Sequence, residues 1–488
     1  MLEVTSNESL LSTAMSTTLL IYDRFHAPSE DDAAILRNAI LDSEKEIAEL
    51  ERNSTASDSR KLRELQASVA QHKSILAPIR KLPPEILGDI FLAVRAREET
   101  EFEPLHSRAG NRFVRVCAAW REIASSMPTL WAEITFGFNY SMSQEALMFF
   151  LSRQLEWSRQ SPLTISYHSG RHRELQCCFP LLLAVADRWQ NVSIHLGSED
   201  LETWHESSMS FPALERIYLG QTVPLCSNMD FKTRCPNLRS LDISFLQDPC
   251  VLPFPWRRIL SLSLVDFPRP VLATLPLLSS VTSVALTIFP LLHNYDSEII
   301  QLPHLTRLKI NHTRNKDSDP HLISLIRAPA LQVLIFESYQ FIMAPSQSET
   351  PNTASHLANF LLSSGCALTK FIFQGDIHPQ ALSDTLALMP TVKEFSFGLF
   401  PSSDSVDGSL IHSLTFTYSD ASPLLPALVS LRLMRPIEYE IDAVVAMLVG
   451  RRKTIRSVAL LEKDDARREA VYTALKANIP GLYVELFK

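Results

Sequence analysis

Few residues of this sequence combine the types and spacing that catalysis or metal binding requires. The 14 histidines are scattered, and no His-Glu-x-x-His, Cys-x-x-Cys, Gly-x-Ser-x-Gly or Ser-x-x-Lys signature occurs in a fitting context. Cys177 and Cys178 are adjacent and could act as a redox or metal pair, but neighbouring cysteines rarely bind one ion with good geometry. We therefore expect no catalytic residue, no metal ion and no cofactor.

Two further candidates have simpler structural interpretations. His72 lies on an apolar helical seam, where a histidine can act as a pH switch but is far more often merely half-exposed. Arg451, Arg452 and Lys453 follow a predicted helix and could contact an acidic partner. We expect these cations to stabilise the C-terminal end of that helix, where the helix dipole favours positive charge.

The composition is typical of a folded protein without nucleic-acid or membrane partners. Hydrophobic residues make up 46% and charged residues 20% of the 488 positions, and a net charge of -8 does not attract phosphate backbones. No apolar stretch approaches the length of a bilayer span, and Glu3 and Glu8 argue against a secretory signal. The 7 cysteines lack framework-like spacing. We expect reduced thiols and a cytoplasmic or nuclear location.

The N-terminal part contains two predicted helical segments. Residues 1–30 are rich in serine and threonine and are predicted to form a flexible arm. In residues 31–77, apolar side chains recur at heptad-like steps on both sides of a polar stretch at 53–59. These apolar residues are Leu36, Ile40, Ile47, Leu50, Leu62, Leu65, Val69 and Leu76. An antiparallel hairpin and one helix of a dimeric coiled coil both fit this pattern, and the turn formers favour the hairpin.

Residues 82–91 read Leu-Pro-Pro-Glu-Ile-Leu-Gly-Asp-Ile-Phe. The predicted N-terminal helices lie before this stretch, and the repeated segments lie after it. A helix is predicted to begin at Pro83, because proline is tolerated in a first turn and Glu85 suits the positive end of the helix dipole. Apolar residues then recur at spacings of three and four, which gives this helix a wide apolar face. A second short amphipathic helix is predicted at 116–124, and residues 128–131 add an aromatic segment.

The pattern Leu-Pro-x-Glu-Ile-Leu-x-x-Ile-Phe, followed by Val-Cys-x-x-Trp-Arg-x-Ile-Ala and Pro-x-Leu-Trp, resembles the F-box motif over residues 79–134. In that family a small three-helix unit docks on a Skp-type adaptor, which tethers it to a cullin-RING ubiquitin ligase. The resemblance implies such a unit at 78–135. It also implies adaptor contacts by Leu82, Pro83, Pro84, Ile86, Leu87, Ile90, Phe91, Val116, Cys117, Trp120 and Ile123. The segment 95–112 is longer than a minimal motif needs, and we expect it to loop out.

A short theme repeats in residues 136–488. Six segments share a proline at their second position and apolar residues at the fourth, seventh and ninth, an alternation typical of a strand with one buried face. They are 211–219, 235–243, 302–310, 328–336, 389–397 and 425–433, with weaker copies ending at 264, 288, 373 and 460. Prolines at 212, 236, 255, 276, 303 and 329 are 19 to 27 residues apart. The pattern resembles the irregular leucine-rich repeats that commonly follow F-boxes.

The repeats predict an α/β fold in which the helical N-terminal units precede an irregular solenoid with parallel strands on its concave face. Short helices are expected between the strands at 179–189, 321–327, 355–362, 380–389 and 441–448. Polar loops are expected at 311–319, 346–353 and 402–409. A helix at 464–478 and a strand at 482–487 are expected to cap the array.

Two functional hypotheses follow from this organisation. In the first, the chain is the non-catalytic substrate-recognition subunit of an SCF-type ubiquitin ligase. Its F-box-like unit then binds the Skp-type adaptor, and through it cullin, while the repeats bind an unknown protein substrate. In the alternative, the chain is a scaffold whose F-box-like unit is structural or acts outside a ligase.

Overall fold

The structure is a computed structural model, and the chain forms two compact units. One unit contains Met1–Tyr167 and Arg173–Leu181, and the other contains His168–His172 and Leu182–Lys488. The structure describes residues 28–52, 59–97, 112–136, 142–169, 173–220, 230–244, 254–266, 268–288, 298–314, 320–340, 353–375, 379–398, 409–415, 424–436, 441–461 and 465–487. The predicted flexible arm at 1–30 falls almost entirely outside these residues. No described helix combines the length and apolar character of a membrane span.

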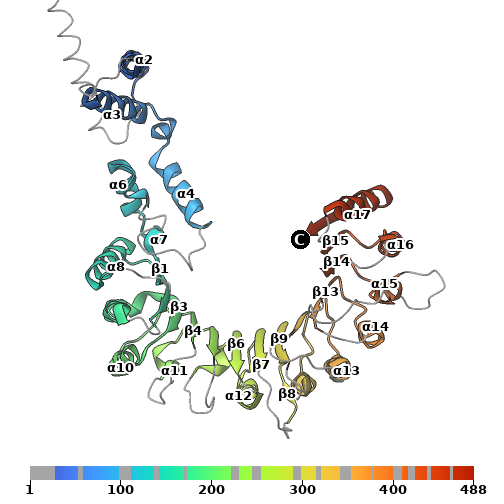
Figure 1. Ribbon diagram of the computed structural model, residues 1–488. Helices are drawn as coiled ribbons and strands as arrows, with labels where there is room; N and C mark the ends of the chain where they lie inside the picture. Colours follow the sequence, from blue (N-terminus) through green and yellow to red (C-terminus); the bar gives the residue numbers. More distant parts are fainter. Residues whose placement is uncertain are drawn as a thin grey trace, which may run out of the picture. The chain divides into compact units, whose positions relative to one another are not determined.

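The first unit begins with two helices that pack against each other, α2 (Glu30–Arg52) and α3 (Ser59–Ile75). Lys61 lies 2.5 Å from Glu46, and Lys73 lies 2.6 Å from Glu44. The two lysines are about 18 Å apart along α3, whereas the two acids are about 3 Å apart along α2. Helix α3 therefore crosses α2 steeply, as Figure 1 also shows, and does not run antiparallel alongside it as predicted.

The rest of the first unit is mainly helical. Its elements are η1 (Pro78–Lys81), α4 (Pro84–Arg95), α6 (Ala118–Ser126), α7 (Pro128–Trp131), β1 (Glu133–Phe136), α8 (Gln144–Ser158), β2 (Leu163–His168), η3 (Arg173–Cys178) and α9 (Phe179–Leu183). Strands β1 and β2 are parallel. Helix α4 begins one residue later than predicted, because Pro83 is its N-cap and offers a carbonyl to the Leu87 amide.

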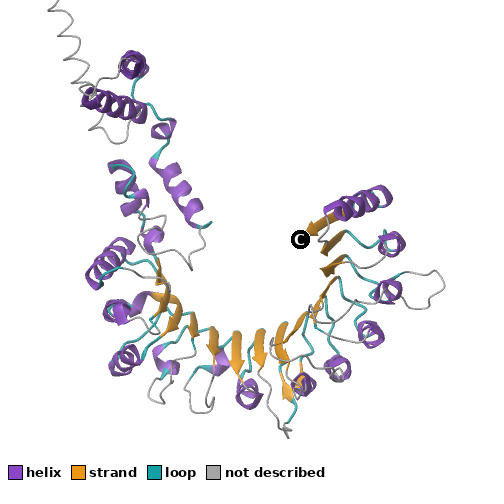
Figure 2. Ribbon diagram, in the orientation of Figure 1, coloured by secondary structure: helices purple, strands orange, loops and turns teal. Residues whose placement is uncertain are grey.

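The second unit is built on a long row of parallel strands (Figures 1 and 2). In spatial order they are β3 (Trp189–His195), β4 (Arg216–Leu219), β5 (Ser240–Ser244), β6 (Ser261–Asp266), β7 (Ser283–Ile288), β9 (Arg307–Arg314), β11 (Val333–Gln340), β12 (Lys370–Gln374), β13 (Glu394–Gly398), β14 (Ser430–Pro436), β15 (Ser457–Leu461) and β16 (Tyr483–Phe487). Strands β8 (Ile300–Gln301) and β10 (Ile326–Arg327) form a separate parallel pair. The predicted α/β class, with a parallel sheet and a helical N-terminal region, is confirmed.

Alternating side chains explain why these segments form strands. In β5, Leu241 and Ile243 are buried while Ser240, Asp242 and Ser244 are half-exposed. The ladder places Leu241 beside Leu262 of β6, so buried residues continue in rows from strand to strand. Each strand thus has one face in the core, as a period of two requires.

The buried rows are covered by helices on one side of the strands (Figure 2). These are α10 (Ser198–Glu206), α11 (Phe231–Arg234), α12 (Pro268–Thr274), α13 (Thr353–Ser364), α14 (Pro379–Ala387), α15 (Ser409–Leu414), α16 (Ile441–Gly450) and α17 (Asp465–Asn478). Short 3-10 turns supplement them: η4 (Ala186–Arg188), η5 (Trp256–Arg258), η6 (Leu275–Leu277) and η7 (Pro320–Leu325). The other side of the strands, which we call the open face, carries the half-exposed side chains.

Several predicted boundaries are wrong. The helix expected at 179–189 ends early, because fully buried Trp189 begins β3. The segment 321–327 forms the 3-10 turn η7 and strand β10 rather than an α-helix. Strand β9 extends through the first residues of the loop expected at 311–319, because its ladder with β11 continues to Arg314. The loops expected at 346–353 and 402–409 lie outside the described residues, except for their last residues, which begin α13 and α15.

Arg451 is buried, and its contacts differ from those predicted. Its guanidinium donates to the carbonyls of Leu414, at 2.6 Å, and Leu425, at 2.9 Å, and also to that of Leu424. Leu414 ends α15, so Arg451 caps that helix and not the one that precedes it. Leu425 has a φ of 45°, which is rare for a residue with a side chain, and this hydrogen bond fixes its backbone. Burial lowers the pKa of Arg451 to about 10, so it remains charged at neutral pH.

We expect the Arg451→Met substitution to lower the free energy of unfolding by about 2–4 kcal/mol, because it leaves buried carbonyl groups without a donor. Chemical denaturation followed by circular dichroism measures this difference. The matched control is Arg452→Met, since Arg452 is exposed, and it should change stability by less than about 0.5 kcal/mol. Equal effects of the two substitutions would contradict the capping role.

Candidate docking face on the helical unit

One side of α4 belongs to the core of the helical unit. Phe91 is fully buried, and Leu87, one turn earlier, is 5% exposed. The Phe91 ring stacks on Phe113, with centroids 4.2 Å apart, and lies 4.9 Å from the ring of Trp120. These aromatic contacts fix which side of α4 faces inward.

Helices α6 and α7 complete this core. Ile123, Ala124 and Leu130 are buried against Phe91, and the Trp131 indole donates to the Ala124 carbonyl at 2.7 Å. Gly88 lies at the crossing, where an added Cβ would be 3.2 Å from the Met127 sulfur. Glycine is unfavourable inside a helix, so close packing against Met127 explains its presence here.

A second side of α4 is apolar but exposed to solvent. Ile86, Ile90 and Val94 follow one another at intervals of four residues and have exposed fractions of 46%, 37% and 42%. Each is one position away from a residue of the inward side, which places this row about 100° round the helix from the core contacts. We call Ile86, Ile90 and Val94 the α4 stripe. Exposed Pro83 lies directly before the helix that carries it.

The residues that the F-box resemblance implied as adaptor contacts have three different environments. Leu87, Phe91 and Ile123 are buried, so they are core residues and not part of a docking surface. Three others are half-buried: Leu82, Cys117 and Trp120. The remaining five are exposed: Pro83, Pro84, Ile86, Ile90 and Val116. The structure adds Val94 to the exposed set and Phe113 to the core.

Cys117 has a structural role of its own. Its sulfur accepts a hydrogen bond from the Trp120 amide at 3.5 Å, so it is the N-cap of α6. This bond is made by the backbone amide of Trp120, whose ring contacts Phe91. Cysteine is not among the preferred N-cap residues, so this role could not be predicted from the residue type.

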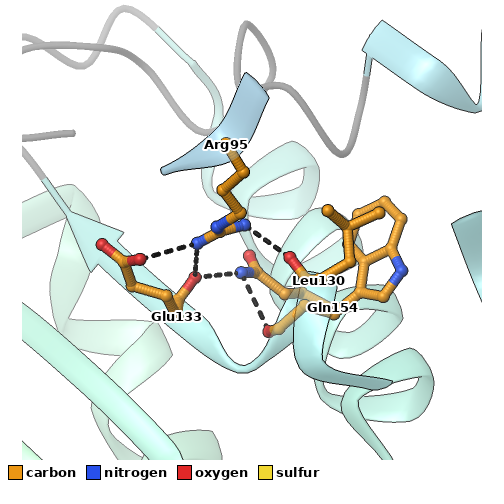
Figure 3. Close-up of polar contacts among 5 residues, drawn as sticks. Arg95, Leu130, Glu133 and Gln154 are labelled. Atoms are coloured by element: carbon orange, nitrogen blue, oxygen red, sulfur yellow. Dashed lines mark hydrogen bonds and ion pairs between the residues drawn. The ribbon is translucent and has the colours of Figure 1, made fainter. Parts of the chain in front are cut away.

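Arg95 connects α4 to the following elements (Figure 3). The guanidinium donates to the Leu130 carbonyl at 2.5 Å, to the Glu133 carbonyl at 3.2 Å and to the Glu133 carboxylate at 3.1 Å. The Gln154 amide of α8 donates to the same Glu133 carbonyl at 2.6 Å and to the Trp131 carbonyl at 3.3 Å. Arg95 was predicted to begin the looped segment 95–112, but it is the buried last residue of α4.

The other chemical candidates have ordinary environments. The sulfurs of Cys177 and Cys178 are 3.9 Å apart, and Cys178 is fully buried. Burial lowers the pKa of His72, which favours the neutral form of this imidazole. Burial raises the pKa of Cys235 to about 12, which keeps it a thiol. Among the described residues, no three His, Cys, Asp or Glu side chains are placed to bind a metal ion.

We expect the Arg95→Met substitution to destabilise the helical unit by about 2–4 kcal/mol, because buried carbonyl groups of Leu130 and Glu133 lose a charged donor. Tryptophan fluorescence during denaturant unfolding reports this, since Trp131 lies in the same core. Arg97→Met is the matched control, because Arg97 is exposed just beyond the helix. The network has no stabilising role if both variants unfold at the same denaturant concentration as the unmodified chain.

Comparisons with known proteins identify no family for this chain. No protein-family model matches the sequence, and no curated protein matches it either. The resemblance to the F-box motif therefore depends on the residues at 79–134 themselves.

Proposed function

We propose that this protein is the substrate-recognition subunit of an SCF-type cullin-RING ubiquitin ligase. In this proposal the α4 stripe and the adjoining Pro83 bind a Skp-type adaptor. The row of parallel strands is a leucine-rich-repeat solenoid that binds the target protein. The chain breaks and forms no bond itself, and its contribution is to hold a target lysine close to a ubiquitin-charged enzyme.

The α4 stripe is the observation that carries this proposal. A short amphipathic helix normally needs one apolar face, and α4 already buries Leu87 and Phe91. The further row of Ile86, Ile90 and Val94 stays in water, although removing such side chains from it would contribute on the order of 1 kcal/mol each. An exposed apolar row beside a rigid core is what a helix-docking partner would cover.

The structure of the surrounding unit supports the same function. The core contacts of Phe91 and the hydrogen bonds of Arg95 hold the C-terminal half of α4 in place. The exposed row is thus preorganised, which reduces the entropy that a partner must remove on binding. In the second unit, the consecutive parallel strands present a polar open face over several tens of ångströms, which suits recognition of a protein.

The test is the affinity of purified full-length chain for a purified Skp-type adaptor. We expect the Ile86→Asp/Ile90→Asp double variant to bind at least 100-fold more weakly, because two carboxylates would be desolvated in an apolar interface. The control is Leu92→Asp, since Leu92 has the same exposed fraction as Ile90, 37%, but lies on the opposite side of α4. Its affinity should change less than threefold.

Two results would contradict the proposal. If the unmodified chain does not bind the adaptor, the F-box-like unit is structural and the scaffold hypothesis replaces the ligase hypothesis. If the double variant and Leu92→Asp lose affinity equally, the adaptor does not use the α4 stripe. Circular dichroism of each variant separates loss of binding from loss of folding.

A further inference from the structure

Four exposed arginines lie where three neighbouring strands of the second unit begin. Arg216 is the first residue of β4, and Arg239 directly precedes β5. Arg257 and Arg258 belong to η5, the turn that leads into β6. Strands β4, β5 and β6 pair in parallel, so they begin at the same edge of the sheet. We call these four residues the arginine edge.

Hydrogen bonds place the residues of the arginine edge side by side. The Arg239 amide donates to the Glu215 carbonyl of β4 at 2.9 Å, and the Arg239 carbonyl accepts from the Leu260 amide at 2.8 Å. The Arg258 guanidinium donates to the carbonyl of Pro236, in the segment that leads into β5, at 3.3 Å. Three strands span about 10 Å between their outer members, so a short peptide segment could reach all of them.

The positive charge of the arginine edge is not compensated by nearby acids. None of its four arginines forms an ion pair within the part of the chain that the structure describes. The acids next to them on β4 and β5 are Glu215, which accepts a hydrogen bond from Gln190 at 3.2 Å, and Asp242, which is hydrogen-bonded to Ser263. Four cations thus face two acids, in a chain whose net charge is -8.

Other cations of the open face do have acidic partners on nearby strands. Three such ion pairs are present: Lys309 with Glu337 at 2.9 Å, Lys370 with Glu394 at 2.6 Å, and Arg432 with Glu485 at 3.2 Å. A guanidinium without such a partner keeps its charged donors available, and its planar fork matches the geometry of a carboxylate. Exposed Arg307 of β9, in the same register row as Arg216, adds further positive charge.

Apolar side chains lie beside the arginine edge and are also accessible. Leu260, the neighbour of Arg239 in the ladder, is 41% exposed, and Trp256 of η5 is half-exposed. The turn is anchored from below, because Phe254 stacks on Phe231 with ring centroids 4.5 Å apart and contacts the Trp256 ring at 5.3 Å. Arginine and tryptophan are enriched where proteins bind one another, and a preorganised surface loses little entropy on binding.

We propose that the arginine edge binds an acidic segment of a partner protein. Aspartate or glutamate side chains of that segment would pair with the guanidinium groups, and an apolar side chain beside them would contact Leu260 and Trp256. Charge complementarity selects this occupant, because four uncompensated arginines repel a basic segment. The inference deepens the proposed function and rests on it, since it names the chemistry of the target that the repeats would recognise.

The experiment is a selection of displayed random decapeptides on the purified full-length chain without adaptor. We expect enriched peptides to share at least two acidic residues and one apolar residue at fixed positions. The Arg239→Glu/Arg258→Glu variant should bind those peptides at least tenfold more weakly, as measured by fluorescence anisotropy. The matched control is Arg452→Glu/Lys453→Glu, which changes the net charge equally at two exposed positions after α16 and should change the affinity less than twofold.

A second pair of variants tests the apolar part of the site. Leu260→Asp would place a carboxylate beside Arg239 and should weaken binding of the selected peptides at least fivefold. Leu362→Asp is its control, because Leu362 is 67% exposed on α13, outside the arginine edge, and its affinity should not change. Circular dichroism of each variant checks that it is folded.

Four results would overturn the proposal. They are enrichment of no peptide, enrichment of peptides without shared acidic positions, and unchanged binding by Arg239→Glu/Arg258→Glu. The fourth is tighter binding of a 20-nucleotide oligothymidylate than of the selected peptides, with loss of that binding in the same variant, which would make the arginine edge a nucleic-acid site.

The selection is independent of the adaptor, so the two proposals can fail separately. The Ile86→Asp/Ile90→Asp variant should bind the selected peptides with unchanged affinity. Binding of acidic peptides through Arg239 and Arg258 in a chain that binds no Skp-type adaptor would support the arginine edge and contradict the ligase. Adaptor binding without peptide enrichment would support the ligase and contradict the arginine edge.

Discussion

The stacking of Phe91 on Phe113 and Trp120 is the contact on which the candidate docking face depends. It fixes the rotation of α4 about its axis, because the buried side must point toward these rings. Once that side is fixed, the spacing of four residues leaves Ile86, Ile90 and Val94 exposed in a row. Arg95, at the end of the same helix, then donates to carbonyls of α7 and β1. A rotation of α4 by one residue position would bury the stripe and break both sets of contacts.

The parallel strands, like α4, have a buried side and a side that is accessible to solvent. A period of two commits one row of side chains to the core, and the alternate row remains available to solvent. Along most of the open face that row is long or charged, and its acids pair with cations of nearby strands. At β5 to β7 the row consists of small residues around Asp242. The core rows thus build the framework, while the open rows remain accessible to solvent.

Much of this fold was predictable because it depends on periodicity. The strands at the ends of the six proline-containing segments were predicted, since apolar residues alternate there, and α4 and α17 were predicted from helical spacing and first-turn residues. Strand β3 was missed, because Trp189 continues the apolar pattern of the preceding helix. Arg95 and Arg451 were missed as buried residues, because their carbonyl partners are 26 to 38 residues away in sequence. Burial of Leu87 and Phe91, and exposure of Ile86 and Ile90, likewise required the packing of α6 against α4.

In the proposed complex, the adaptor covers the exposed side of α4 while the buried side stays unchanged. Hydrogen exchange of the full-length chain, with and without a purified Skp-type adaptor, measures this directly. We expect slower exchange in residues 79–95 when the adaptor is bound, and unchanged exchange in the strands from β3 onward. Formation of a complex without protection of residues 79–95, or with protection confined to the strands, would contradict docking of the adaptor on α4.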